Sequence, residues 1–188
     1  NKDFSLEPER VISEVDNCTK LIFLCSPNNP TSNSLSREAV VKIVDAVNCI
    51  VVVDEAYIDF SKADSLLSLV PEKKNLVVLQ TLSKAWGLAG IRLGMVFAHP
   101  ELIGYLSSVK YPYNINTLSL EEALKQIGQG DRNQTWLDSI QHERNTLEIT
   151  LNRFPFVEKV FPSDANFLLV KMNNPGHVYS FLMERGII

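Results

Sequence analysis

The sequence lacks the features that mark several large classes of protein. No run of apolar residues approaches the roughly 20 residues that a membrane-spanning helix needs. The 18 basic and 22 acidic residues give a net charge of −4, and no basic stripe of the kind that nucleic-acid binders carry is present. The 45% hydrophobic content is ordinary for a soluble globular protein. We therefore expect a cytoplasmic protein that binds neither membranes nor nucleic acids.

Cysteine and histidine are scarce, with three of each. An odd number of cysteines without C-x-x-C spacing argues against a disulfide framework and against a zinc site. Cys25 and Cys49 lie in or beside apolar runs, where a free thiol behaves as a small hydrophobe. The three histidines lie far apart in the sequence, so we expect no metal site.

Four short runs of consecutive apolar residues, rich in β-branched side chains, are present instead. Runs this short, and apolar on both faces, are typical of strands buried on both sides of a sheet. Between the first two runs, residues 36–47 show helical spacing, with Ser36 as the expected N-cap. A strand, a helix and a second strand in this order predict a parallel pair and an α/β domain. The four runs are Leu21–Leu24, Ile50–Val53, Leu76–Leu79 and Met95–Ala98.

The pattern changes after about residue 110. A turn-rich connection precedes a helix predicted over 118–126 and a long helix predicted over about 134–153, in which we expect Trp136 to be buried. Residues 156–160 and 167–171 indicate two strands, and 177–185 indicate a last helix with Gly186 at its C′ position. We expect two domains: residues 1–111 form part of a large domain, and 112–188 form a connecting helix and part of a smaller α+β domain. Because both ends look cut, we expect a fragment of a longer protein.

Polar residues follow three of the apolar runs and could carry chemistry. They are Ser26–Thr31 after the first run, Asp54–Tyr57 after the second and Gln80–Lys84 after the third. In open parallel sheets, ligands bind outside the carboxyl ends of the strands. The three clusters therefore predict one shared site.

The residue types in these clusters suit a phosphorylated, cationic aromatic ring. A lysine in a poorly hydrated pocket becomes a nucleophile, which is the role open to Lys84. Arg92 can offer a bidentate fork to a phosphate, and Asp54 at a strand end needs a cationic partner or firm hydrogen bonds. Each residue also has a structural alternative. These are a solvated lysine, an arginine paired with a carboxylate and an aspartate that caps a helix.

At these clusters the chain resembles a known family. Residues 81–84 read T-L-S-K and residues 87–92 read G-L-A-G-I-R, which resembles the lysine signature of the fold-type-I aminotransferases that use pyridoxal phosphate (PLP). Residues 29–32 and 54–57 are similar to the N-P-T-G and D-E-A-Y motifs of the same family, in the same order. The longer strings around them resemble the histidinol-phosphate aminotransferases. Ser32 stands where the family has glycine, and we expect an unusual backbone angle there.

The resemblance implies a fold-type-I large domain with a mainly parallel sheet, PLP as the cofactor and a homodimer in the full-length protein. It implies transamination between histidinol phosphate and 2-oxoglutarate in histidine biosynthesis. Lys84 would be the catalytic residue that bonds to PLP and moves a proton, and Asp54 would pair with the ring nitrogen. The other implied contacts are Asn29 and Tyr57 with the ring oxygen, Thr81, Ser83 and Arg92 with the phosphate, and Asn166 with the substrate.

Three alternatives stay open at this point. The chain could belong to another aminotransferase, to a threonine-phosphate decarboxylase on the same fold, or to a non-catalytic protein that kept the fold. A nucleotide-binding domain is disfavoured, because neither G-x-G-x-x-G nor the P-loop pattern occurs. We expect Glu55, which follows Asp54, to point away from the site and assign it no role.

Overall fold

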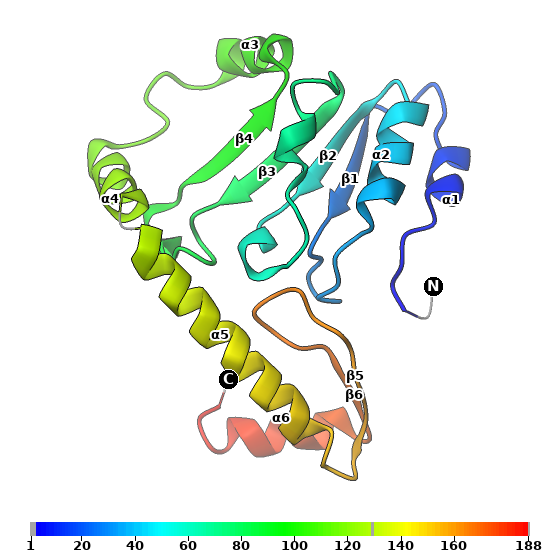
Figure 1. The fold of residues 1–188 in the computed structure, drawn as a ribbon, viewed down its shortest axis with the longest axis vertical. Coiled ribbons are helices and arrows are strands. Elements are labelled where there is room, and N and C mark those ends of the chain that lie inside the picture. The colour runs from blue at the N-terminus through cyan, green and yellow to red at the C-terminus, as the bar shows by residue number, and fades with distance from the viewer. Residues whose placement is uncertain (1–2, 129, 188) are drawn as a thin grey trace.

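The computed structural model describes residues 3–128 and 130–187, without the side chains of residues 130–133 (Figure 1). A four-stranded sheet with flanking helices forms the first part of the chain. A long helix then leads to a two-stranded hairpin and a last helix (Figure 1). Among the described residues, no helix is long and apolar enough to cross a membrane.

The four apolar runs form one sheet, in the order β1-β2-β3-β4. The strands β1 (Leu21–Cys25), β2 (Ile50–Asp54) and β3 (Leu76–Thr81) are parallel, whereas β4 (Gly94–Ala98) runs antiparallel to β3. The four predicted strands and the α/β class are thus confirmed. Cys25 pairs with Asp54, and Asp54 pairs with Leu79, so the carboxyl ends of the parallel strands lie at one edge.

One face of this sheet carries the main core. Val51, Val53 and Val78 are completely buried there, beneath the helix α2 (Arg37–Ala46). The Ser36 side chain accepts a hydrogen bond from the Ala39 N–H at 3.2 Å, which confirms the predicted N-cap. The short helix α1 (Pro8–Ser13) packs beside α2 (Figure 1). On the other face, Phe23 of β1 is 64% exposed.

The connections between strands are mostly short 3-10 turns. The chain from β2 to β3 passes through η1 (Ile58–Phe60) and η2 (Leu66–Leu69), and η3 (Ala89–Ile91) lies between β3 and β4. The helix α3 (Pro100–Val109) follows β4. Sequence reasoning did not predict α3, although Pro100 opens it and His99 caps it.

The second part of the chain follows the predicted order of elements. Its helices are α4 (Thr117–Ile127) and α5 (Gly130–Leu151), which confirm the two predicted helices. The hairpin strands are β5 (Val157–Val160) and β6 (Val170–Met172), and α6 (Pro175–Met183) follows them. In Figure 1, α5 extends away from the sheet and reaches the hairpin and α6.

Several details of the second part differ from the prediction. The strand predicted to begin at residue 167 begins at Val170, because residues 163–167 form a turn in which the Ser163 hydroxyl donates to the Phe167 carbonyl at 2.6 Å. The expected burial of Trp136 is wrong, since 44% of this residue is exposed. Gly186 has a φ of +73°, yet it lies two residues after the C-cap Glu184, at C″ rather than C′.

The two parts touch at the loop that follows β1. The Asp164 N–H, from the turn between β5 and β6, donates to the Ser32 carbonyl at 2.8 Å, and its carboxylate accepts from the Ser34 N–H at 3.1 Å. Leu137 of α5 and Ala165 of the turn pack into a second core cluster with Tyr57. The division into domains at residues 111 and 112 stays a prediction; this position lies in the segment between α3 and α4.

Candidate cofactor site

The carboxyl ends of the parallel strands place Cys25, Asp54 and Thr81 side by side on one face of the sheet. Paired residues in a sheet share a face, and residues two apart on one strand point the same way. Cys25 pairs with Asp54, and Thr81 lies two residues after Leu79, the partner of Asp54 on β3. The three polar clusters predicted to share a site therefore do converge at this edge.

Asp54 presents a carboxylate that is only half satisfied. One oxygen, Oδ1, accepts from the Ala56 N–H at 2.9 Å. Among the described backbone groups and side chains, no donor binds the other oxygen, and the Asp54 side chain is half-buried. Partial burial, and after it the nearby charge of Asp54, raise the pKa of the Cys25 thiol. A negative charge with a free oxygen is thus present at this edge, as a protonated ring nitrogen requires.

Tyr57 joins the residues from all three motifs. Its hydroxyl oxygen accepts a hydrogen bond from Asn29 Nδ2 at 3.1 Å. The Lys84 Nζ lies 5.3 Å from the centre of the Tyr57 ring. Asn29 lies 28 positions before Tyr57 in the sequence and Lys84 lies 27 positions after it, and both approach this one tyrosine. Lys84 itself is exposed, so the amine lies on an open surface and not in an enclosed pocket.

The Tyr57 ring is held by aromatic and apolar neighbours. Only 8% of this residue is exposed, and Phe167 meets its ring edge-on with 5.3 Å between the ring centres. Ala85, next to Lys84, belongs to the same buried cluster. Sequence reasoning missed Phe167, although the predicted contact of its neighbour Asn166 with the substrate was a signal that this segment reaches the site. The second part of the chain thus fixes the position of a predicted site residue.

Thr81 and Ser83 form a compact pair of hydroxyls. The Thr81 Oγ1 accepts from the Ser83 N–H at 3.1 Å and donates to the Ser83 Oγ at 3.0 Å. It also lies 3.3 Å from the Leu93 carbonyl, which is a second acceptor for its hydrogen. Hydroxyl hydrogens rotate, so both groups can turn toward an incoming anion.

Two of the predicted site residues, Arg92 and Asn166, do not contact the other predicted site residues through hydrogen bonds in the described part of the chain. The Arg92 guanidinium donates to the Ala89 carbonyl at 3.1 Å, and the residue is exposed, with a left-handed φ of +56°. It contacts neither Thr81 nor Ser83 through a hydrogen bond among the described residues. Asn166 is also exposed, between the buried Ala165 and Phe167, and has no hydrogen bond to the other predicted residues within the described chain.

The loop that carries Asn29 contains the expected unusual backbone. Ser32 has a φ of +63° and is completely buried. Its hydroxyl donates to the Thr31 carbonyl at 2.6 Å and lies 3.3 Å from the Pro162 carbonyl. A left-handed backbone at a position where the resembling family has glycine confirms the expectation from sequence.

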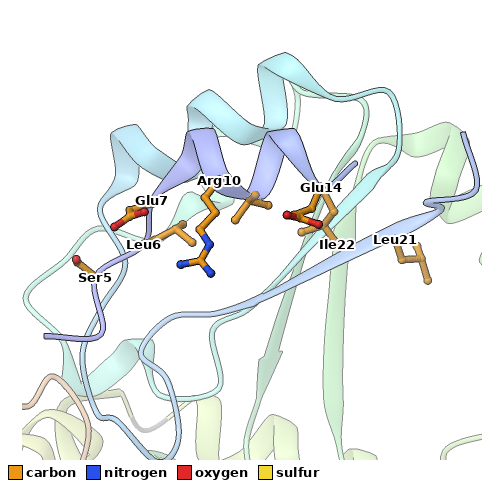
Figure 2. A pocket seen from close by; sticks show the side chains of 8 residues that line it. Ser5, Leu6, Glu7, Arg10, Glu14, Leu21 and Ile22 are labelled. Carbon is orange, nitrogen blue, oxygen red and sulfur yellow. The ribbon is translucent and has the colours of Figure 1, made fainter. Parts of the chain in front are cut away.

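An apolar groove lies away from all of these residues. It has a volume of about 470 Å³ and lies between the segment 5–14 and β1, where Leu21 and Ile22 form part of its wall (Figure 2). Figure 2 shows Arg10 extending from α1 toward the open space. None of the sequence-predicted site residues line this groove. The candidate site is therefore an exposed edge of the sheet, not the groove.

Comparison with known proteins adds an independent finding. The family model described as "Aminotransferase class I and II" matches residues 1–188. The chain belongs to this family. A histidinol-phosphate aminotransferase from Parabacteroides distasonis is 50% identical over 188 residues, which are 100% of this chain and 54% of that protein. One from Flavobacterium johnsoniae is 46% identical over 99% of this chain and 53% of its own length. The chain thus spans about half the length of the curated relatives it matches.

Solved structures of the family have the same fold. The crystal structure of the histidinol-phosphate aminotransferase from Clostridium acetobutylicum matches with a TM-score of 0.92 at 22% identity, over 100% of this chain and 58% of that one. The enzyme from Sinorhizobium meliloti in complex with pyridoxal 5′-phosphate matches with a TM-score of 0.84 at 22% identity, over 97% of this chain and 52% of that one. These similarities confirm the fold-type-I architecture of this aminotransferase segment.

Proposed function

We propose that this chain supplies the cofactor-binding part of a PLP-dependent histidinol-phosphate aminotransferase. The observation that carries the proposal is the convergence of Asn29, Tyr57 and Lys84, with Asp54 at the same edge of the sheet. These residues come from the three motifs that resemble the family. The substrate, histidinol phosphate with 2-oxoglutarate, is supported by the names of relatives at 42–50% identity.

The residues present fit PLP at both the ring and the phosphate. When bound, the cofactor supplies an electron sink for the substrate carbon that loses its proton. Asp54 would bind the ring nitrogen through its free oxygen and hold a proton there. Thr81 and Ser83 would turn their hydroxyls to the phosphate. Arg92 would exchange the Ala89 carbonyl for a phosphate oxygen, which needs only a side-chain rotation because the guanidinium is exposed.

Tyr57 and Lys84 would act on the reactive side of the cofactor. Because Asn29 donates to the Tyr57 oxygen, the phenolic hydrogen is left to point outward and donate to the ring oxygen. Lys84 would bind the cofactor through Nζ and carry the proton that moves during transamination. Asn166 stays a candidate for substrate contact. The proposal includes a homodimer in the cytoplasm and the division into domains 1–111 and 112–188.

The fold alone does not separate transamination from decarboxylation. The L-threonine-O-3-phosphate decarboxylase from Porphyromonas gingivalis matches with a TM-score of 0.78 at 24% identity, over 95% of this chain and 56% of that one. Relatives named histidinol-phosphate aminotransferase reach 50% identity, which favours the aminotransferase.

The test uses the full-length protein. PLP is added, the complex is reduced with borohydride, and the modified peptide is mapped. We expect the adduct on Lys84, and then formation of glutamate from histidinol phosphate and 2-oxoglutarate. No adduct would reject the PLP function as a whole. An adduct with release of carbon dioxide from a phosphorylated amino acid, and no glutamate, would assign a decarboxylase instead.

A further inference from the structure

Glu55 is the one buried charged residue in the part of the chain whose side chains are described, with 2% of it exposed. A carboxylate in such a place is costly unless donors surround it. Its oxygen Oε2 accepts from the Ser65 hydroxyl at 2.6 Å and from Gln80 Nε2 at 2.9 Å. Its oxygen Oε1 accepts from the Leu66 N–H at 2.8 Å. We refer to Glu55, Ser65, Gln80 and the Leu66 N–H as the Glu55 cluster.

The Glu55 cluster joins three separate segments. Glu55 directly follows β2, Gln80 belongs to β3, and Ser65 with Leu66 starts the turn η2. Gln80 Nε2 also lies 3.3 Å from the Ser65 hydroxyl, so the three side chains contact one another. The Glu55 N–H donates to the Leu79 carbonyl at 2.8 Å, which continues the pairing of β2 with β3. The cluster therefore fixes the ends of these strands relative to each other.

The Glu55 cluster lies directly behind the candidate cofactor site. Side chains alternate between the faces of a sheet, so Glu55 and Gln80 occupy the face opposite to Asp54 and Thr81. Within the cluster, Glu55 directly follows Asp54 and Gln80 directly precedes Thr81, and both Asp54 and Thr81 are predicted contacts of the cofactor. We propose that Glu55 is a positioning residue, whose hydrogen bonds to Gln80, Ser65 and the Leu66 N–H hold Asp54 in register with the segment that begins at Thr81. This inference rests on the proposed PLP function.

A second, partly buried set of hydrogen bonds serves as a control. Asn75 Nδ2 donates to the carbonyls of Val44 and Val47 at 2.9 and 3.1 Å. Asn75 precedes β3, at the opposite edge of the sheet from the predicted site. Replacing Asn75 removes partly buried hydrogen bonds to the end of α2, so it lowers stability without touching the strand ends that carry Asp54 and Thr81.

The experiment compares four variants of the full-length enzyme: Glu55→Ala, Glu55→Gln, Gln80→Leu and Asn75→Ala. The dissociation constant for PLP is measured from the absorbance of the bound cofactor, well below each unfolding temperature. We expect Glu55→Ala and Gln80→Leu to weaken PLP binding at least tenfold and to shift the absorbance maximum. Glu55→Gln should bind within about threefold of the wild type, because an amide oxygen still accepts from the Leu66 N–H and Gln80 can turn its own amide. Asn75→Ala should unfold at a lower temperature and bind PLP normally.

The outcomes separate the two proposals. A wild type that forms no adduct with PLP rejects the proposed function. A wild type that binds PLP, together with Glu55→Ala and Gln80→Leu variants that bind it equally well, overturns the positioning role. If Glu55→Ala does not fold, Gln80→Leu decides alone. Glu55→Gln binding as weakly as Glu55→Ala would overturn the hydrogen-bond basis of the proposal.

Discussion

Replacing Ser32 with glycine and with alanine separates the cost of its backbone angle from the contribution of its hydroxyl. The residue is completely buried, with a φ of +63°. The left-handed conformation costs a residue with a Cβ about 1–2 kcal/mol, and glycine does not have this cost. Glycine also lowers the free energy of unfolding by roughly 0.4–1 kcal/mol, because it gives the unfolded chain more conformational freedom. Alanine keeps the strained angle and gains nothing.

The hydroxyl contributes in the opposite direction. Both replacements remove the hydrogen bonds to the Thr31 and Pro162 carbonyls, a loss of about 0.5–1.5 kcal/mol net for a typical hydrogen bond. Ser32→Ala should therefore lower the free energy of unfolding by about 1 kcal/mol. Ser32→Gly should stay within about 1 kcal/mol of the wild type and be more stable than Ser32→Ala.

Urea unfolding of the cofactor-free protein measures both differences. The midpoint should fall for Ser32→Ala, with an unchanged dependence on denaturant concentration, and should lie higher for Ser32→Gly than for Ser32→Ala. An alanine variant as stable as the glycine variant would refute the reasoning, because it would mean that the position does not need a left-handed backbone.

Three further predictions concern the site itself. Lys84→Ala should abolish the borohydride adduct and lower kcat at least 100-fold, the scale of a lost acid–base group, without a change in unfolding temperature. Tyr57→Phe should weaken PLP binding about tenfold in a titration, since it removes one hydrogen bond of about 1.4 kcal/mol to the ring and frees Asn29. The raised pKa of the Cys25 thiol keeps it protonated to higher pH, so alkylation there should accelerate only at more alkaline pH than for a free thiol. PLP should protect Cys25, whereas Cys18, which precedes β1 at the other edge of the sheet, should react as fast with PLP as without it. Equal protection of both thiols would contradict the placement of the site.

The elements that sequence could predict are those fixed by local patterns. The four apolar runs became strands, as expected for short apolar runs rich in β-branched residues, but the expected burial on both sides of the sheet is wrong for β1, where Phe23 is 64% exposed. The Ser36 cap and the left-handed angle at Ser32 were likewise properties of a few adjacent residues. The burial of residues that depends on packing between elements was harder to predict. In α5, Leu137 is buried with 7% of it exposed, whereas 44% of its neighbour Trp136 is exposed. No local sequence pattern shows which of these two apolar residues faces the core.

The site was predictable as a set of residues more than as a geometry. Parallel strands bring their carboxyl ends together, so the approach of Asn29 and Lys84 to Tyr57 followed from strand order. The direction of the Arg92 side chain could not be predicted from strand order, because an exposed guanidinium donates to whichever acceptor is near, here the Ala89 carbonyl. The role of Glu55 was also hidden, since its donors lie 10, 11 and 25 residues away in the sequence.

Asp54 and Glu55 are adjacent acids whose environments differ in a testable way. The Asp54 carboxylate keeps a free oxygen at the candidate site, so its proposed function depends on charge. The Glu55 carboxylate is surrounded by three donors, so its function depends on accepting hydrogen bonds. The same chemical change, carboxylate to amide, should therefore lower activity strongly at Asp54 and hardly change it at Glu55.

We expect Asp54→Asn to lower kcat by about 100-fold or more, the scale of a lost preorganised charge, because a neutral amide no longer holds a proton on the ring nitrogen. Glu55→Gln should change kcat less than about threefold, since its amide oxygen still accepts from the Leu66 N–H and Gln80 can turn its own amide to accept from the new NH₂ group. Kinetics of both variants at saturating PLP provide the comparison. Equal losses would mean that the two acids share one electrostatic function, which strand alternation does not allow, because it directs the two side chains to opposite faces of the sheet.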